Sequence, residues 1–259
     1  MASLSSTARL TAARKSMSML YACFIFLKLT SQAPMLALAV AWAYGLVIYA
    51  IYLFLIRLWR DRADLVLVGL FFGTLSAAQF IANKLVDYGI GVAPAGTVIF
   101  MTNVAVLDAM AVFYGRSFAL RAVRLGFFFQ AAVAFAAWAA STLPPPAWFA
   151  ERAAVVDSVL APSARIAAAS LTAYLISSTV DVYIVTKWPR LHILARVYSS
   201  SLVAQVVDSL VFISLAFGPE ASVITGQILV KWAQIPLEAV LIYGARRYVK
   251  AIVAQQAPA

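Results

Sequence analysis

Residues 165–183 read RIAAASLTAYLISSTVDVY, and this stretch indicates the class of fold. Almost all of its side chains are apolar or small, and its length is close to the ~20 residues that a membrane-spanning helix needs. Asp181 nevertheless lies deep inside it, where a carboxylate costs on the order of 2.5–3.5 kcal/mol on the insertion scale. Such residues usually face the interior of a helix bundle or a wet cavity. The stretch therefore predicts a membrane protein with a polar interior.

The rest of the chain has the same character. Of its 259 residues, 64% are hydrophobic and only 12% are charged, and the mean hydropathy is +0.92, whereas a soluble domain has about 25% charged residues. Barrel strands are ~10 residues long and alternate in polarity, so the long apolar runs favour helices. We predict an all-α, polytopic bundle of membrane helices. The runs cover 35–56, 65–82, 97–113, 122–143, 166–186, 198–217 and 222–245.

The basic residues gather in alternate loops between these runs. The positive-inside rule predicts that such loops, and with them the C-terminus, are cytoplasmic. The intervening loops hold only Lys84 and Arg152. The net charge of +10 is thus a topological signal, and we expect the lipid bilayer rather than a nucleic acid as partner. The basic loops contain Arg57, Arg60 and Arg62; Arg116, Arg121 and Arg124; Lys187, Arg190 and Arg196; and Arg246, Arg247 and Lys250.

Residues 1–60 are predicted to form an N-terminal extension with one or two membrane helices. The shorter apolar run 17–30 contains Lys28 and follows three basic residues. A cytoplasmic N-terminus requires this run to cross, which gives eight helices; if it lies along the inner surface, seven remain. We favour eight, and we expect no cleaved signal peptide because no small-residue cleavage site follows the run. Residues 61–248 then form a six-helix core, and 249–259 form a cytoplasmic tail.

Polar side chains recur at spacings of three and four residues, which places them on one face of each of four helices. The stripes are Ser76, Gln79 and Asn83; Ser170, Tyr174, Ser177 and Asp181; Ser201, Gln205 and Asp208; and Gln227, Lys231, Gln234 and Glu238. Turned inward, the four stripes form a polar central cavity, in which we expect Asp181, Asp208 and Lys231 to form one coupled centre. The candidate substrate-binding residues are Asn83, Asn103, Asp108, Ser177, Asp181, Gln205, Asp208, Gln227 and Lys231. The candidates for a gate or an ion pair are Lys84, Arg165 and Glu238.

The alternative is that these stripes are purely structural, with interhelix bonds such as an ion pair between Lys231 and Asp208. Hydrogen bonds of this kind average only ~0.6 kcal/mol in membranes. That is a small gain for burying so many ionisable groups, so we favour a functional cavity. His192 lies in a basic loop and is expected to be solvated.

The spans also suggest an internal repeat. Residues 65–143 and 165–245 each hold three spans, so the second trio must run opposite to the first. Inverted repeats with a binding site near the midplane are typical of transporters. In this arrangement Asn83 corresponds to Asp181, and Asp108 corresponds to Asp208.

Six segments, in this order, resemble the motifs of the queuosine precursor transporter family, also called vitamin uptake transporters. They are IANKLV (81–86), PAGTVIF (94–100), DAMAVFYG (108–115), PSARIAAASLTAYLISSTVDVY (162–183), ARVYSSSLVAQVVDSLVFISLAF (195–217) and GQILVKW (226–232). The resemblance covers about 65–245. It implies a transporter in the inner membrane of a prokaryote that imports a 7-deazaguanine base, such as 7-cyano-7-deazaguanine, for tRNA modification. Ala111 and Val112 depart from the family pattern, in which Thr-Glu is common.

The predicted chemistry fits such a base. Its ring N–H and amino group are adjacent donors, and a carboxylate can accept two parallel hydrogen bonds. We expect Asp181 to be this acceptor, and Arg165, nearer the outer mouth, to pair with an acid or stabilise a gate. A homodimer is left open, and we expect no cofactor and no metal.

Three other functions share some of these features. The nearest is a transporter of the same fold for another small heterocycle or vitamin. A retinal-binding photoreceptor would also have a lysine midway along its last helix, but Gln227 occupies the place of the usual aspartate four residues before Lys231. An enzyme is not expected, since the chain has no His-Glu-x-x-His and no Gly-x-Ser-x-Gly motif.

Overall fold

The computed structural model describes residues 34–82, 84–160 and 164–256, and in this part of the chain it is almost entirely helical. Seven segments are long and apolar enough to cross a membrane: Leu36–Leu58, Arg60–Ile81, Gly96–Tyr114, Arg116–Ser141, Ala167–Lys187, Ile193–Ala216 and Ala221–Arg246. They confirm the predicted fold class, and each coincides with one of the predicted apolar runs. The run 17–30 lies outside the described residues.

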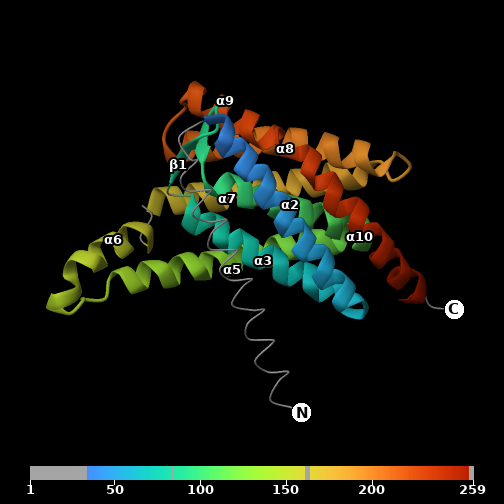
Figure 1. The fold of residues 1–259 in the computed structure, drawn as a ribbon, viewed down its shortest axis with the longest axis horizontal. Coiled ribbons are helices and arrows are strands. Elements are labelled where there is room, and N and C mark those ends of the chain that lie inside the picture. The colour runs from blue at the N-terminus through green and yellow to red at the C-terminus, as the bar shows by residue number, and fades with distance from the viewer. Residues whose placement is uncertain (1–33, 83, 161–163, 257–259) are drawn as a thin grey trace, which may run out of the picture.

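The long helices lie side by side and connect two ends of the bundle (Figure 1). The elements in chain order are α2 (Pro34–Leu58), η1 (Arg60–Arg62), α3 (Ala63–Ile81), β1 (Leu85–Asp87), β2 (Val92–Pro94), α4 (Gly96–Tyr114), α5 (Arg116–Ser141), η2 (Ala147–Phe149), α6 (Ala150–Leu160), α7 (Ala164–Lys187), α8 (Ile193–Ala216), α9 (Ala221–Trp232) and α10 (Ile235–Gln256).

Contacts across the bundle identify one end as the basic end. There the guanidinium of Arg116 lies 3.4 Å from the ring centroid of Tyr183, which joins the start of α5 to the last turns of α7. The hydroxyl of Tyr243 lies 3.2 Å from Nε2 of His192, and η1 contacts α10. Helix α3 starts at this end and α7 finishes there, so the two predicted trios run in opposite directions.

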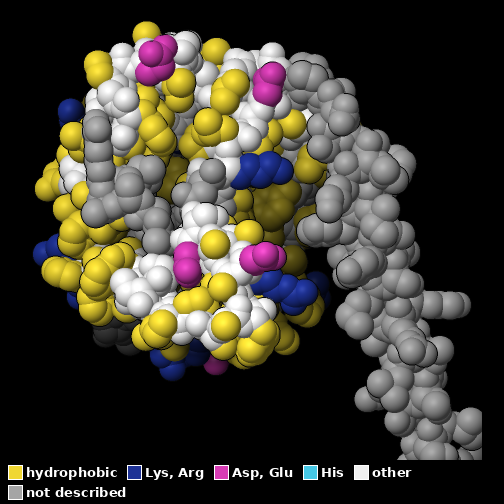
Figure 2. Space-filling view, turned by 90° about the vertical axis from the view of Figure 1, so that its left-hand side faces the viewer, with side chains coloured by type: hydrophobic (Ala, Val, Ile, Leu, Met, Phe, Trp, Pro, Cys, Tyr) yellow, Lys and Arg dark blue, Asp and Glu magenta, His cyan; other side chains and the backbone are white. Residues whose placement is uncertain are grey.

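The opposite end carries the β1–β2 hairpin and is called the hairpin end. Strand β1 pairs antiparallel with β2, with Leu85 opposite Pro94. The hairpin packs on α9 so closely that a Cβ atom built on Gly226 would lie 2.8 Å from the carbonyl oxygen of Val92. Figure 2 views this end and shows scattered charged side chains around a hollow with a hydrophobic floor.

Helix α4 is the centre of the bundle. Of the most apolar part of α4, 83% is buried, whereas the corresponding figure for every other span is at most 50%. It contacts α2, α3, α5, α7, α8, α9 and α10. This explains why its sequence is apolar on all sides, with only a few polar residues: an evenly hydrophobic helix belongs in the core of a bundle.

The last predicted span differs from expectation. The sequence predicts one helix over 222–245, but the structure divides this run into α9 and α10 at Ala233 and Gln234. Pro236 gives the reason, because proline has no N–H to donate to the carbonyl four residues earlier. The break leaves Lys231 in the last turn of α9 and Glu238 in the first turn of α10. Each charge therefore lies at the helix end whose dipole favours it.

Single cysteines can test the membrane topology in a Cys23→Ser background, since Cys23 is the only native cysteine. Cysteines at Asp61, Ser117 and Arg190 should react with an impermeant maleimide only after intact cells are permeabilised, because all three lie at the basic end. A cysteine at Ala147 should react without permeabilisation. Labelling Ala147 and Ser117 from the same side would contradict the helix arrangement.

The contact between the hairpin and α9 predicts a specific effect of Gly226→Ala. The added methyl group would overlap the backbone of Val92, and overpacking of this kind costs roughly 1–3 kcal/mol. We expect a lower midpoint of thermal unfolding in detergent. Gly73→Ala is the matched control, because a Cβ built there meets no atom within 4 Å apart from its chain neighbours and the nearby backbone of its own helix. Equal midpoints for the two variants would show that the hairpin does not depend on this contact.

Candidate functional site

A central cavity of about 70 Å³ lies among α3, α4, α5, α7, α8 and α9. The wall residues on α3, α4 and α7 belong to the halves of these helices that are nearer the hairpin end. Its wall contains Leu75, Ala78, Gln79, Ala82, Pro94, Gly96, Thr97, Phe100, Gln130, Ser170, Leu171, Ala173, Tyr174, Asp208, Phe212, Gln227 and Lys231. The cavity thus draws on both predicted trios of helices, as a site between two repeats should.

Four polar atoms on this wall are buried and have no hydrogen-bond partner among the described residues. They are Oε1 of Gln79, Oγ1 of Thr97, Nε2 of Gln130 and Oε1 of Gln227. Leaving such an atom unsatisfied costs about 1–3 kcal/mol. Most buried polar groups in proteins have a partner, so four exceptions around one cavity indicate that a bound molecule or water completes them.

The unpartnered atom of Gln130 on α5 is its amide nitrogen. Oε1 of Gln130 lies 3.3 Å from the hydroxyl oxygen of Ser76 on α3, whose single hydrogen has a nearer acceptor in the carbonyl of Phe72, at 3.0 Å. The NH₂ group of Gln130 is left as a donor at the cavity. Gln79 and Gln227 present oxygen atoms instead. The wall therefore offers both acceptors and one amide donor.

Aromatic rings complete the wall. Phe100, Tyr174 and Phe212 come from three different helices. The hydroxyl of Tyr174 donates to the carbonyl of Val123 over 3.1 Å, which fixes the ring between α7 and α5. Nζ of Lys231 lies 5.1 Å from the ring centroid of Phe100. Aromatic faces of this kind are suited to stacking against a planar ligand.

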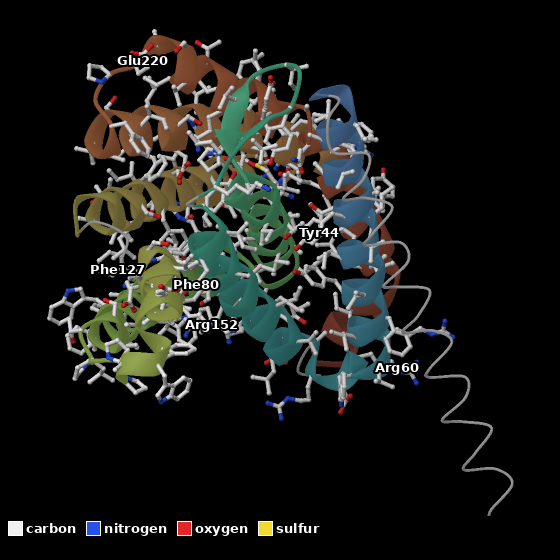
Figure 3. The ribbon with its side chains drawn as sticks, turned by 60° about the vertical axis from the view of Figure 1, so that its left-hand side comes forward. Tyr44, Arg60, Phe80, Phe127, Arg152 and Glu220 are labelled. Carbon is white, nitrogen blue, oxygen red and sulfur yellow. The ribbon has the colours of Figure 1, made fainter. Side chains whose placement is uncertain are left out.

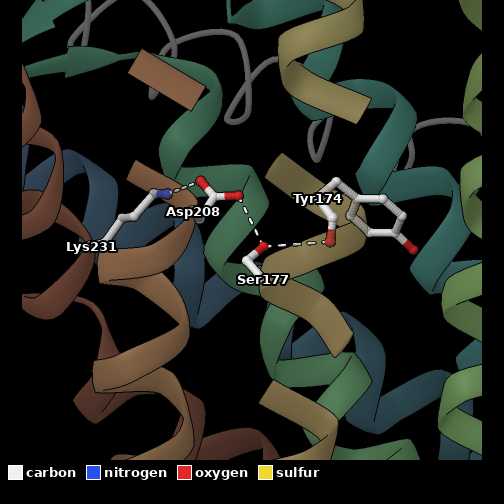
Figure 4. A network of polar contacts seen from close by, with 4 residues as sticks. All are labelled: Tyr174, Ser177, Asp208 and Lys231. Atoms are coloured by element: carbon white, nitrogen blue, oxygen red, sulfur yellow. Dashed lines mark hydrogen bonds and ion pairs between the residues drawn. The ribbon is translucent and has the colours of Figure 1, made fainter. Parts of the chain in front are cut away.

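The charged part of the site is a buried ion pair between α9 and α8 (Figure 4). Nζ of Lys231 contacts Oδ2 of Asp208, and the lysine side chain is only 1% exposed. Ser177 on α7 donates to the other oxygen, Oδ1 of Asp208, over 3.0 Å. The network joins three helices at the cavity, and it contains two members of the predicted coupled centre.

The third member, Asp181, lies in a second polar group. Asp181 is four residues beyond Ser177 and therefore about one helical turn nearer the basic end. Its carboxyl group contacts that of Asp108 on α4. Ser201 on α8 donates to Oε2 of Glu238 on α10 over 2.7 Å and lies 3.5 Å from Oδ2 of Asp108. We call Asp108, Asp181 and Glu238 the acid cluster.

The structure thus divides the predicted binding residues. Asp208, Gln227 and Lys231 line the cavity, and Ser177 bonds to Asp208. Asp108, Asp181 and the predicted gate residue Glu238 form the acid cluster instead, and the cavity wall contains none of them. The described residues include neither Asn83 nor the side chain of Arg165.

Three further predicted residues lie outside the cavity wall. Nδ2 of Asn103 donates to the carbonyl of Phe71 over 2.6 Å and so ties α4 to α3. Gln205 is buried with an unpartnered Oε1. Lys84 is exposed and borders a separate groove of about 680 Å³ between α2 and the hairpin. Figure 3 shows Tyr44, which also lines this groove, on the side of α2 that faces α4.

Several wall residues are not among the binding residues that the sequence predicts. Gln79 and Ser170 belong to the polar stripes without being candidates for binding. Gln130 is the only amide side chain in the long apolar helix α5, and a lone amide in such a helix could have been predicted to face a polar interior. Thr97 and the aromatic residues carry no such signal, because they resemble ordinary helix-packing residues. Among the described residues, no group of three His, Cys, Asp or Glu side chains could hold a metal ion.

Substitutions of Lys231 and Asp208 should have non-additive effects on the midpoint of thermal unfolding. Lys231→Met leaves the carboxylate of Asp208 buried without compensation, which typically costs 3–5 kcal/mol. We expect a large fall in the unfolding midpoint, and a smaller fall when Asp208→Asn is added. Lys84→Met is the control, because its side chain is exposed, and it should change the midpoint little. A double variant that loses the sum of the two single effects would show that the residues do not interact.

Comparison with known proteins agrees with this arrangement. Residues 94–245, more than half of the chain, match the family model described as "Putative vitamin uptake transporter". No curated protein and no solved structure matches the chain. The matched range contains α4 to α9 and the first half of α10, and hence the ion pair, the acid cluster and most of the cavity wall. The chain is a multi-pass membrane protein, and it belongs to the vitamin uptake transporter family, also called the queuosine precursor transporter family.

Proposed function

We propose that this protein imports a 7-deazaguanine base, such as 7-cyano-7-deazaguanine, across the inner membrane of a prokaryote. The observation that carries the proposal is the set of four unpartnered polar atoms around the central cavity, beside the carboxylate of Asp208. The family supports the coarser function of small-molecule uptake. The chemistry of the cavity wall supports the more specific choice of substrate.

A deazaguanine base is complementary to this wall. One edge of the ring carries adjacent N–H and amino donors, and the neighbouring carbonyl is an acceptor. Asp208 is suited to the donor edge, because carboxylates accept two parallel hydrogen bonds. The oxygens of Gln79 and Gln227 are further acceptors, and the NH₂ of Gln130 can donate to the carbonyl. Phe100 and Tyr174 supply aromatic surfaces for the flat ring.

This proposal moves the principal acceptor from Asp181, the residue expected from the sequence, to Asp208. The reason is positional: Asp208 lines the cavity, whereas Asp181 contacts Asp108 in the acid cluster. Both oxygens of Asp208 already have partners, Lys231 and Ser177. Binding of the base therefore exchanges these contacts for new ones, with Lys231 remaining close as the countercharge.

The size of the cavity bears on the transport cycle. Sites for drug-sized ligands usually have volumes of ≈300–1,000 Å³, and the cavity of about 70 Å³ is much smaller. We infer that this conformation is contracted and that the cavity widens when a base enters. Entry from the hairpin end is the shorter route, because Pro94 and Gly96 belong to the wall and lie next to the hairpin.

A complementation assay tests the substrate. In a host that cannot make the precursor, expression of this protein should restore modified tRNA when the base is supplied at low external concentration. Asp208→Asn replaces an acceptor oxygen by a donor and should reduce uptake at least tenfold, since a site that demands a hydrogen bond discriminates strongly when that bond is lost.

Asp64→Asn is the matched control, because Asp64 is partly exposed in the first turn of α3, far from the cavity. It should support wild-type uptake. An analogue without the exocyclic amine should bind much more weakly than the parent base. If the folded wild-type protein reaches the membrane and restores no modified tRNA, another small heterocycle becomes the substrate to test.

A further inference from the structure

The acid cluster has more buried carboxyl groups than its surroundings can stabilise as anions. Asp108 and Glu238 are 0% exposed and Asp181 is 1% exposed. They come from α4, α10 and α7, so three separate helices bring acids to one place. An isolated carboxylate in such surroundings is very costly, and buried charges are normally paired or bound to metal.

Hydrogen-bond donors are too few for three carboxylates. Ser201 has one hydroxyl hydrogen, and its nearest acceptor is Oε2 of Glu238, at 2.7 Å. Ser200 also lies near Asp181, but it donates to the carbonyl of Val197 over 3.0 Å. Four oxygens of these three carboxyl groups have no hydrogen-bond partner among the described residues: both oxygens of Asp181, Oδ1 of Asp108 and Oε1 of Glu238.

Asp181 is the member of the acid cluster with the fewest hydrogen-bond partners. Its side chain is buried, has no donor for either oxygen among the described residues, and is directed at Asp108, to which Ser201 already connects Glu238. An ionised carboxyl group can only accept hydrogen bonds, and a protonated one can also donate. Two carboxyl groups in contact therefore become a hydrogen-bonded pair when one of them holds a proton.

No neighbouring group that the structure describes removes the need for that proton. Lys231 is paired with Asp208 on the cavity side. Arg196 on α8 is half-buried and donates Nε to the carbonyl of Val185 over 2.7 Å. Tyr49 on α2 is buried beside the cluster and carries no charge in its phenol form. In the described part of the chain, no salt bridge reaches any of the three acids, and no three acids are arranged to hold a metal ion.

We propose that Asp108, Asp181 and Glu238 form a proton-binding site, occupied in this conformation, and that proton release from it drives uptake of the base. The second half of this inference rests on the proposed function. The step is a simple transfer: a carboxylate takes a proton while the cavity faces the hairpin end, and the carboxylic acid later gives it to water at the basic end. One proton then moves in the same direction as the substrate.

The position of the acid cluster explains how this coupling works. The cluster connects α4, α7, α8 and α10 on the basic-end side of the cavity, and its protonated form holds these helices together through hydrogen bonds. Loss of a proton leaves like charges side by side, which repel strongly at low dielectric. The helices then separate towards the basic end, and water reaches the acids. The break between α9 and α10 allows Glu238 to move while Lys231 stays at the cavity.

Infrared spectroscopy of the purified protein in lipid nanodiscs tests the site without any substrate. The wild type should show the C=O stretching band of buried carboxylic acids at neutral pH, with a shift in D₂O and loss at alkaline pH. Asp181→Asn and Asp108→Asn should each reduce the band. Asp64→Asn is the control and should leave it unchanged, because Asp64 is partly exposed in the first turn of α3, outside the acid cluster.

Thermal unfolding gives a second measurement that does not depend on transport. The wild type should lose stability as pH rises, because the folded form holds protons that alkali removes. The double variant Asp108→Asn with Asp181→Asn mimics neutral acids and should unfold at a midpoint that depends less on pH. No acid band in the folded wild type, or stabilisation of the wild type by Na⁺ that Asp181→Asn abolishes, would overturn the proton site.

Proteoliposomes test the coupling. An imposed inward proton gradient should accelerate uptake of labelled base by the wild type severalfold, and this acceleration should vanish in Asp181→Asn. The variant should still bind the base, measured as a rise in unfolding midpoint. Wild-type uptake that ignores the gradient would overturn the coupling. An acid band that titrates normally in a protein that moves no base would support the proton site and count against the proposed substrate.

Discussion

The molecule depends on one constraint: α4 is buried on all sides in a protein whose exterior faces lipid. Neither lipid nor the surrounding apolar side chains can pair with a polar group, so the polar residues of α4 must be satisfied inside the protein. The amide of Asn103 bonds to the carbonyl of Phe71 on α3, and Asp108 lies beside Ser201 on α8 and Asp181 on α7. The helices around α4 are thus positioned both by apolar packing and by hydrogen bonds to its few polar side chains.

This constraint also separates the interior into two polar regions. Near the hairpin end, amides, aromatic rings and the Lys231–Asp208 pair surround a cavity. Nearer the basic end, the acid cluster lies among α4, α7, α8 and α10. A ligand site above a layer of ionisable groups gives a transporter two elements that it needs: a place for the substrate, and a contact between helices whose strength can change.

The division of the last span connects the two regions. Pro236 interrupts the hydrogen bonds of the helix, and Lys231 and Glu238 then lie on opposite sides of the break. Discontinuous helices at a binding site are a recurring feature of transporters, because half-helix ends stabilise charge there. Here the break places Lys231 in the last turn of α9 and Glu238 in the first turn of α10, where the helix dipoles stabilise their charges.

Local composition is sufficient to predict the apolar runs, their alternation and the presence of a polar interior. These features follow from local composition, since the bilayer imposes a minimum apolar length and charged loops have a preferred side. Helical spacing also predicted which face of α7, α8 and α9 is polar. The family motifs are short local patterns on these same helices, which is why the sequence alone is enough to recognise the family.

Which polar residues meet depends on how the helices pack in three dimensions. Helical spacing gives the direction of a side chain around its own helix, but not its depth relative to residues on another helix. Asp181 and Asp208 each end a polar stripe with the same helical spacing. Asp208 nevertheless lies at the cavity with Lys231, whereas Asp181 lies about one turn nearer the basic end, beside Asp108. Gln130 and Phe100 joined the cavity wall for the same reason: long-range packing around α4 sets the depth at which each side chain faces its neighbours.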